Sequence, residues 1–256
     1  MNSVTEELYP LQNGLKIADP SHSRIMWRLR ELYPEKNRDY TWDELGTAYL
    51  VRDIYADQIR FCPQKRAWYI WDKRWEKQID SGVISDMFQT LLNLLRLYAE
   101  DIGNDDYKKF VNSLRKTTTI HNVIELLKTM CRLYTTDMDT NPYLLNTPTG
   151  AIDLRTGEHL DDISQYNVTK ITNTHPENAF SKHCDRWDQF IDEIMSHDQE
   201  KARFLQRALG YSILGVNRSE CMFIAYGSTT RNGKGTLMES IKRQWVKTTS
   251  SPPPPR

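Results

Sequence analysis

Closely spaced cysteines, an excess of charge of one sign and long apolar runs are all missing from this sequence. Its four cysteines form no Cys-x-x-Cys pair, so neither a zinc ribbon nor a disulfide framework is indicated. We expect buried thiols in a reducing compartment. Lysine plus arginine and aspartate plus glutamate number 34 each, so no global field draws the protein toward nucleic acid or a membrane surface. Any contact with nucleic acid must come from a local patch. The cysteines are Cys62, Cys131, Cys184 and Cys221.

A secretory signal and a membrane span are missing as well. Residues 1–15 contain acidic residues and no apolar run, and no stretch of 18 apolar residues could cross a bilayer. We therefore expect a cytoplasmic protein with no membrane partner. Enough apolar surface is present for a packed core, since 39% of the 256 residues are hydrophobic and 11% are aromatic.

Hydrophobic periodicity predicts a mainly helical first part with small β-hairpins. Apolar residues recur at helical spacing in 25–32, and three further helical stripes lie in 84–130. Aromatic and β-favouring residues on both sides of a Pro-Gln-Lys turn at 63–65 predict a hairpin within 58–77. Turn signals between short apolar runs predict strands within 143–160.

The second part begins after 172–184, where periodicity is weak and a domain boundary is expected. Two helices are predicted next, the second with Asp198 as its N-cap and Gly210 as its end. The apolar run 221–227 is typical of a buried parallel strand. A helical stripe follows in 237–245.

A glycine-rich segment joins this predicted strand to the last helix, as in a phosphate-binding loop. Such a loop needs an apolar strand, a turn whose N–H groups converge on phosphate oxygens, and a helix N-terminus facing the anion. Lys234 would place its ammonium on the β and γ phosphates of ATP, and Gly233 would let the backbone approach. The candidate phosphate-binding residues are Gly227, Ser228, Thr229, Thr230, Arg231, Asn232, Gly233, Lys234, Gly235 and Thr236.

Two features depart from the pattern G-x-x-x-x-G-K-[ST]. Five residues instead of four separate Gly227 from Gly233, and Gly235 follows the lysine where a hydroxyl would normally hold Mg²⁺. Thr236 lies one position late, so magnesium bound with ATP would be held only through this residue. An ordinary strand–turn–helix with an incidental Gly-Lys pair is the alternative interpretation.

A local basic patch with interleaved aromatic residues lies in 60–77, where six basic and two acidic residues give a net charge of +4. Such a mixture could stack bases and follow a phosphate backbone. The alternative is that the aromatic side chains fill the core of a small sheet, with the charges on its solvated face. The candidate DNA contacts are the turn residues Lys65, Arg66, Lys73 and Arg74.

No metal site of the protein's own is predicted. Asp137-Met-Asp139 is the nearest approach to a paired-carboxylate site, but aspartate is a routine turn residue and a solvated loop explains it. His183 beside Cys184 has no further ligand at a suitable spacing.

Several short motifs, taken together and in order, resemble the phage and plasmid primase-helicases related to the poxvirus primase-helicase. The resemblance covers roughly residues 45–245. In that family a primase-associated helical domain precedes a superfamily 3 helicase core. The motifs are Arg60-Phe61 with 68-WYIWDKRWEK-77, 144-LLNTPTGAIDLRTGEHL-160 with Thr169-Lys170, 187-WDQFIDEIM-195, 204-FLQRALGYSILG-215, and Tyr-Gly-x-x-x-Arg-Asn-Gly-Lys at 226–234.

The resemblance implies an α+β fold: a mainly helical primase-associated domain with small β-hairpins, then the first helices, strand and phosphate loop of a truncated α/β AAA+-like helicase core. The expected divisions are an N-terminal extension at 1–45, the primase-helicase-associated domain at 46–176, the start of the helicase domain at 185–245 and a disordered proline-rich tail at 246–256.

The implied function is ATP-driven unwinding of DNA by a homo-oligomeric ring during replication of a mobile element, with ATP and Mg²⁺ as cofactors. The family's acidic strand, sensor residue and arginine finger would follow the phosphate loop, and no residue here matches them. Because those groups stabilise charge during hydrolysis, we expect the isolated chain not to turn over ATP appreciably. The sequence end suggests a truncated or frame-shifted reading frame, or part of a longer protein.

Two other functional readings remain. The chain could be a non-catalytic module that binds DNA or a partner protein and keeps a vestigial phosphate loop. An unrelated nucleotide kinase fits poorly, because such enzymes place the phosphate loop near the start of the chain, whereas here it begins at Gly227.

Overall fold

The computed structural model describes residues 19–174, 184–227 and 232–245. It divides into two compact units, one formed by Met1–Asp72 and Glu76–Thr135 and the other by Lys73–Trp75 and Thr136–Arg256. Among the described residues there are eight α-helices and two small three-stranded antiparallel sheets. The predicted α+β class is confirmed at this level. The domain boundaries expected near residues 45 and 176 stay a prediction.

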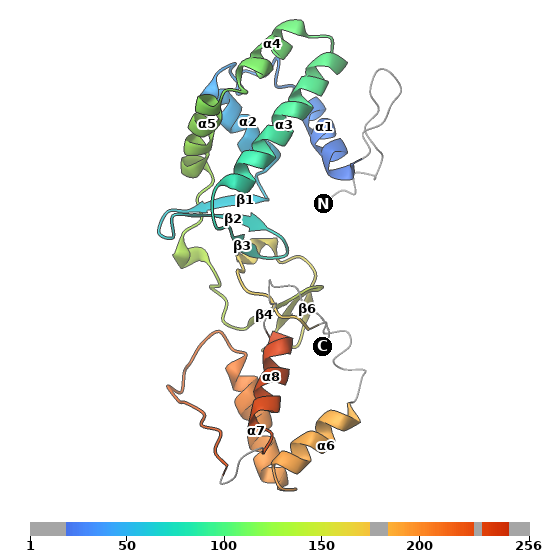
Figure 1. Cartoon of the computed structure of the whole chain (residues 1–256), viewed down its shortest axis with the longest axis vertical. Coiled ribbons are helices and arrows are strands. Elements are labelled where there is room, and N and C mark those ends of the chain that lie inside the picture. Colours follow the sequence, from blue (N-terminus) through green and yellow to red (C-terminus); the bar gives the residue numbers. More distant parts are fainter. Residues whose placement is uncertain (1–18, 175–183, 228–231, 246–256) are drawn as a thin grey trace. The chain divides into compact units, whose positions relative to one another are not determined.

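Three of the five helices of the first unit begin at a residue whose side chain caps the helix N-terminus. Asp19 accepts a hydrogen bond from Ser21 N at 2.8 Å, Asp43 accepts one from Gly46 N at 2.7 Å, and Asn104 accepts one from Tyr107 N at 2.9 Å. The helices are α1 (Pro20–Leu32), α2 (Glu44–Ile54), α3 (Gly82–Asp101), α4 (Asp105–Ser113) and α5 (Thr117–Met130), drawn in blue to green in Figure 1.

One apolar core holds these helices together, and many of its members come from the predicted stripes. Met26 and Leu29 of α1, Phe88 and Leu91 of α3, and their neighbours on the other helices are fully enclosed. Each apolar stripe therefore finds a partner within the unit, which is how most helices in globular proteins gain their stability. The other fully or almost fully buried members include Leu95, Val111, Val123 and Leu127.

The predicted hairpin within 58–77 is confirmed. Strands β1 (Ile59–Cys62), β2 (Ala67–Trp71) and β3 (Trp75–Lys77) lie in the order β1-β2-β3, and β1 pairs with β2 from Ile59↔Ile70 to Cys62↔Ala67. On the outer side of β1, Phe61 N donates to Cys131 O at 2.6 Å and Leu133 N donates to Phe61 O at 3.0 Å. Through these bonds, the segment that follows α5 pairs with β1 and covers this edge of the sheet.

The second unit contains the predicted strands β4 (Leu144–Thr147), β5 (Gly150–Asp153) and β6 (His159–Leu160), in that order. The amide of Asn146 donates to Lys73 O at 3.0 Å and to Lys170 O at 2.9 Å, and Trp75 N donates to Val168 O at 2.7 Å. These bonds explain why Lys73–Trp75 belongs to this unit. Two short 3₁₀ turns, η1 (Thr135–Asp137) and η2 (Ser164–Tyr166), flank the strands in sequence.

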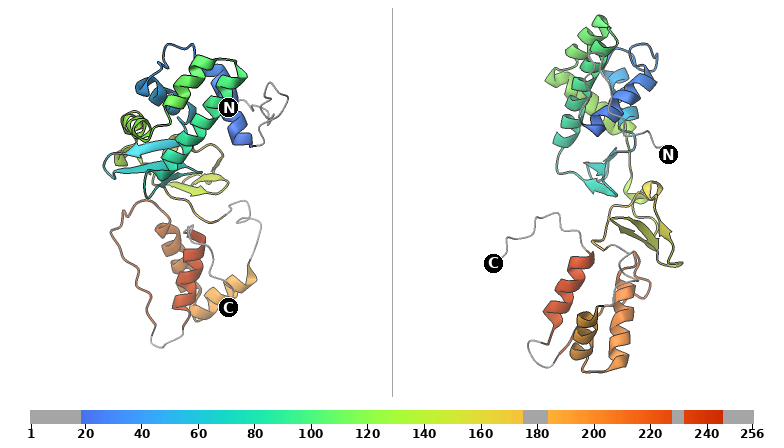
Figure 2. Two further views of the ribbon diagram at one scale, coloured as in Figure 1. Left: turned by 45° about the horizontal axis from the view of Figure 1, so that its top comes forward. Right: turned by 90° about the vertical axis from the view of Figure 1, so that its right-hand side faces the viewer.

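Three further helices complete the second unit: α6 (Asp185–Ile194), α7 (Gln199–Ser212) and α8 (Lys234–Trp245), orange to red in Figure 2. The predicted N-cap is confirmed, since Asp198 Oδ1 accepts from Glu200 N at 3.0 Å and from Lys201 N at 3.1 Å. The predicted end at Gly210 is wrong, because α7 continues to Ser212. A glycine inside a helix costs only about 1 kcal/mol, so by itself it does not stop the helix.

The buried parallel strand predicted at 221–227 is also wrong. These residues adopt no regular secondary structure, and Met222, Ile224 and Tyr226 expose 79%, 77% and 88% of their surface. A parallel strand needs neighbouring strands covered on both faces, whereas both sheets of the described residues are small and antiparallel. Phe223 instead lies edge-on to Phe204 and Tyr211 of α7, at centroid distances of 6.1 and 6.3 Å.

The four cysteines are all free, but only two are buried as predicted. Cys62 and Cys131 lie in the first unit's interior, whereas Cys184 and Cys221 are exposed in the second unit.

None of the helices in the described ranges combines the length and the apolar character needed to cross a bilayer.

Candidate functional site

The glycine of the predicted phosphate loop lies at the start of α8 and against α6. Gly233 has φ +81°, a conformation that favours glycine, and its carbonyl accepts the hydrogen bond of Leu237 N at 2.9 Å. A Cβ at this position would lie 2.5 Å from Ile194 Cγ2 and 3.3 Å from the Phe190 ring. Only glycine therefore lets the chain pass this close to α6 and turn into α8.

The two ends of the loop come together. A Cβ on Gly227 would collide with the Asn232 amide and would lie 3.1 Å from Lys234 Nζ. Lys234 Nζ donates to Asn232 Oδ1 at 2.6 Å. The structure thus places Gly227, Asn232, Gly233 and Lys234 beside one another, although the strand expected before them is missing. Ser228, Thr229, Thr230 and Arg231 lie outside the described residues.

The start of α8 offers the groups that a phosphate needs. The first N–H groups of a helix have no acceptor within the helix and carry its positive dipole end, and Lys234 is the first residue of this helix. Gly235 has no hydroxyl, and Thr236 is exposed on the first turn. The residues present therefore fit a phosphate group, while Thr236 carries the one hydroxyl that the described loop residues, 227 and 232–236, offer to Mg²⁺.

The basic candidates are divided between the two units. Lys65 and Arg66 are exposed in the β1–β2 turn of the first unit, where Arg66 has φ +48°. Lys73 and Arg74 belong to the second unit, and Lys73 Nζ donates to Pro148 O at 2.7 Å. The structure therefore does not establish the four as one surface.

The aromatic residues between these charges are mostly buried. Trp68, Tyr69 and Trp75 expose 3%, 6% and 4% of their surface. Their ring faces are part of the protein interior, so they do not form a stacking platform for bases. The alternative interpretation, in which the aromatic residues fill the core around a small sheet, is confirmed for these three.

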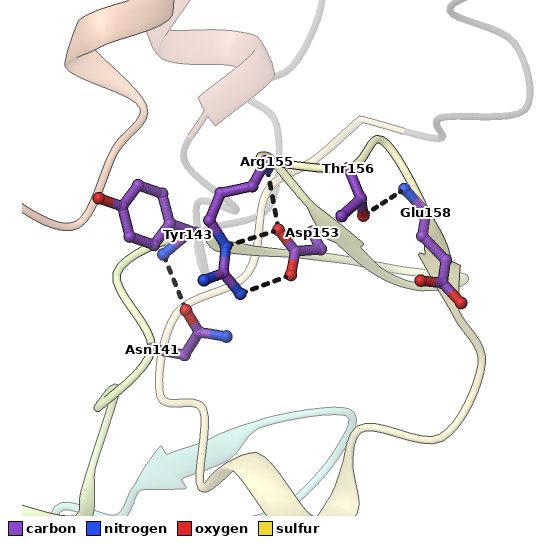
Figure 3. A network of polar contacts seen from close by, with 6 residues as sticks. All are labelled: Asn141, Tyr143, Asp153, Arg155, Thr156 and Glu158. Carbon is purple, nitrogen blue, oxygen red and sulfur yellow. Dashed lines mark hydrogen bonds and ion pairs between the residues drawn. The ribbon is translucent and has the colours of Figure 1, made fainter.

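Sequence reasoning missed a cluster of two arginines around Tyr143. The guanidinium carbons of Arg155 and Arg218 lie 5.0 and 5.4 Å from the centre of the Tyr143 ring. Figure 3 shows Arg155 also paired with Asp153, with Nη2 3.0 Å from Oδ2. This hydrogen bond to Arg155 holds the pKa of Asp153 below its ordinary value.

The turn after β5 builds this cluster. Arg155 N donates to Asp153 Oδ1 at 2.8 Å, and Glu158 N donates to Thr156 Oγ1 at 3.2 Å (Figure 3). An Asp-x-Arg-Thr-Gly turn was visible in the sequence, but Arg218 is distant along the chain and gave no signal. Guanidinium groups next to an aromatic ring can contact phosphates or bases of nucleic acid.

Of the two aspartates considered as a metal site, Asp137 and Asp139, the second has a structural role. The Asp139 carboxylate accepts hydrogen bonds from Thr169 N at 2.7 Å and from Thr169 Oγ1 at 2.5 Å. In the part of the chain that the structure describes, no three His, Cys, Asp or Glu side chains gather as metal ligands would. His183 lies outside that part.

The described residues thus define a mainly helical α+β protein with a glycine–lysine loop at the start of its last helix. A family model described as "D5 N terminal like" matches residues 48–196. The chain belongs to this family, which is the N-terminal region of primase-helicases, so the predicted resemblance is confirmed at that level. The matched segment ends before the predicted phosphate loop. A search of curated proteins finds no match.

Proposed function

We propose that this chain provides the N-terminal region of a phage or plasmid replicative DNA primase-helicase and binds ATP through residues 227–236. The family match at 48–196 supports the first part. The observation that carries the second part is the convergence of Gly227, Gly233 and Lys234 at the N-terminus of α8. ATP would supply the free energy for DNA unwinding in a complete helicase.

Each described loop residue has a role in this proposal. Lys234 exchanges its bond with Asn232 Oδ1 for oxygens of the β and γ phosphates, and the first N–H groups of α8 donate to the same anion. Gly227 and Gly233 keep side chains away from the space that the phosphates need. Thr236 is the candidate ligand for Mg²⁺.

Calorimetry with ATP and Mg²⁺ tests this proposal. We expect wild-type binding in the micromolar range. Lys234→Ala should weaken it at least about 100-fold, because the ammonium makes charge-assisted contacts to two phosphates. Lys242→Ala removes an exposed lysine from the last turn of the same helix and is the matched control. The proposal fails if wild type does not bind ATP, or if Lys234→Ala binds as well as wild type.

The alternative is a non-catalytic module that binds DNA or a partner protein. The observation in its favour is the exposed, irregular conformation of 221–227, because the loop then lacks the strand that would fix its first end. DNA binding without ATP binding would support this alternative. Assembly into a homo-oligomeric ring belongs only to the helicase proposal, and light scattering with and without ATP measures it.

A further inference from the structure

The structure brings two guanidinium groups to one tyrosine ring in the second unit. Arg155 lies in the turn after β5, and Arg218 lies in the segment after α7. Their guanidinium carbons are 5.0 and 5.4 Å from the centre of the Tyr143 ring. Gly215 N donates to Pro142 O at 2.8 Å, which ties the segment that carries Arg218 to the chain just before Tyr143. We call Tyr143, Arg155 and Arg218 the arginine–tyrosine cluster.

The Tyr211 hydroxyl of α7 fixes the backbone around Arg218. It donates to Asn217 Oδ1 at 2.9 Å and accepts a hydrogen bond from Ser219 N at 2.8 Å, so it holds the residues on both sides of Arg218. Groups that are in place before a ligand arrives lose less conformational freedom on binding, which favours affinity. The backbone at Arg218 is therefore preorganised.

Both arginines keep hydrogen-bond donors that the protein does not use. Arg155 Nε and Nη2 donate to the Asp153 carboxylate at 3.3 and 3.0 Å, whereas Arg155 Nη1 has no acceptor among the described residues. The Arg218 guanidinium has neither an ion-pair nor a hydrogen-bond partner within residues 19–174, 184–227 and 232–245. These donors are accessible, since the Arg155 side chain is 59% exposed and Arg218 is an exposed residue.

The charges of the cluster favour an anionic ligand. Asp153 pairs with Arg155, and Figure 3 shows the Glu158 side chain pointing away from Arg155. One carboxylate thus stands beside two guanidinium groups that contact the same ring. Like charges repel, so an anion placed between the two arginines would relieve this repulsion as well as accept their free N–H groups.

We propose that the arginine–tyrosine cluster binds the phosphate backbone of single-stranded DNA, with the Arg218 guanidinium and Arg155 Nη1 donating to phosphate oxygens. Guanidinium donors match phosphate oxygens in geometry and charge, and phosphate contacts make up much of protein–DNA hydrogen bonding. A guanidinium beside an aromatic ring also offers a flat surface to an unstacked base, which a single strand presents and a duplex does not. The inference rests on the proposed function, which supplies DNA as the partner. Neither arginine belongs to the basic patch at 60–77.

Fluorescence anisotropy with a labelled oligothymidine measures the contribution of Arg218. Arg218→Gln changes an exposed side chain that makes no ion pair or hydrogen bond in the described chain, so the fold should be retained. We expect binding about tenfold weaker, because charge-assisted hydrogen bonds to phosphate are lost. The slope of log K against log salt concentration should fall in magnitude by about 0.7, the value for one charge on a single strand. Arg155→Gln should also weaken binding, but it frees the Asp153 carboxylate as well, so Arg218→Gln is the sharper variant.

Arg207→Gln is the matched control, because it removes the same charge from an exposed position of α7 in the same unit. Equal weakening in Arg207→Gln and Arg218→Gln would overturn the inference, since it would show a general effect of charge. Unchanged oligothymidine binding in Arg218→Gln would overturn it as well and leave DNA binding intact. If Arg218→Gln weakens binding of a duplex as much as binding of oligothymidine, the assignment to a single strand is overturned.

Two further outcomes separate this inference from the proposed function. If Arg218→Gln loses binding of inorganic pyrophosphate in calorimetry but keeps that of oligothymidine, the cluster binds a free phosphate compound and the DNA assignment is overturned. If wild type binds no oligothymidine, this inference and the DNA-binding part of the proposed function both fail. Calorimetry with ATP then still decides whether residues 227–236 bind the nucleotide.

Discussion

Helices α3 and α6 both carry a clear apolar stripe, but only α3 is buried. Phe88 and Leu91 of α3 are 0% exposed, whereas α6 has no buried residue among its apolar positions. Figure 1 shows α3 among the helices of the first unit, and α6 lies in the second. An amphipathic stripe therefore predicts that a helix forms. Whether its apolar face is buried depends on whether other elements of the fold pack against that face.

The contrast extends to the units that contain these helices. The first unit has one continuous core drawn from five helices and a hairpin. In the second, α7 and α8 bury one residue each, Ala208 and Leu237. Because burial of apolar surface is the main favourable contribution to folding, we expect the first unit to hold most of the chain's stability. One comparison between the units and two tests within single units sharpen this contrast, beginning with the largest expected effect.

Phenylalanine-to-alanine changes in α3 and α7 should differ sharply. Phe88 is 0% exposed and Phe204 is 64% exposed. Phe88→Ala should lower the free energy of unfolding by about 3–5 kcal/mol, because it removes buried surface and leaves a cavity. Phe204→Ala should lower it by less than about 1 kcal/mol. Urea unfolding followed by circular dichroism measures both. Similar losses in the two variants would show that α7 has a core that its exposure does not reveal.

Alkaline pH should destabilise the first unit through its buried tyrosines. Burial raises the pKa of Tyr55 to about 12, and it raises the pKa of Tyr107 still further. The unfolded tyrosine ionises near pH 10, so the contribution of Tyr55 is complete below about pH 10 and is lost as the pH rises toward 12. The expected loss for Tyr55 is on the order of 2 kcal/mol.

Urea titrations at pH 8 and pH 11.5 measure this loss. Tyr55→Phe should reduce the difference between the two pH values, although it also removes the hydrogen bond that the Tyr55 hydroxyl donates to Met87 O at 3.0 Å. A pH dependence unchanged in Tyr55→Phe would contradict the assignment to this residue.

Alanine substitutions at two glycines of the glycine–lysine loop should change stability in opposite directions. Gly233→Ala should destabilise the contact between α8 and α6 by about 1–3 kcal/mol, because the new methyl meets Ile194 and the backbone has φ +81°. Gly235 lies inside α8 with open space around its Cα, so Gly235→Ala should stabilise that helix by up to about 1 kcal/mol. Hydrogen exchange of the α8 amides reports both changes. Equal effects in the two variants would argue against the packing of Gly233 on α6.

Elements with a strong local signal could be predicted from sequence. The apolar stripes in 84–130 predicted three helices, the turn at 63–65 predicted the hairpin, and Asp198 predicted the start of a helix; the structure contains all of them. These features could be predicted because apolar spacing and helix capping depend on residues only a few positions apart. Gly210 misled the prediction, since a glycine ends a helix only where the chain actually turns left-handed. For the candidate site, the glycine–lysine loop and the following helix were visible in the sequence, but the proximity of Arg218 to Tyr143 was not.

The sequence by itself determined where helices, hairpins and the glycine–lysine loop lie, because these follow from backbone preferences and the period of apolar residues. Only the tertiary structure decided which apolar segments are covered. The run 221–227 reads as a buried strand, yet it is exposed because the described residues offer it no parallel neighbour. The sequence around Trp68 suggests a ring that could stack on bases. In the structure this ring is buried, and its indole N–H has no acceptor among the described residues. Burial and hydrogen-bond satisfaction depend on residues distant along the chain, and local pattern does not contain that information.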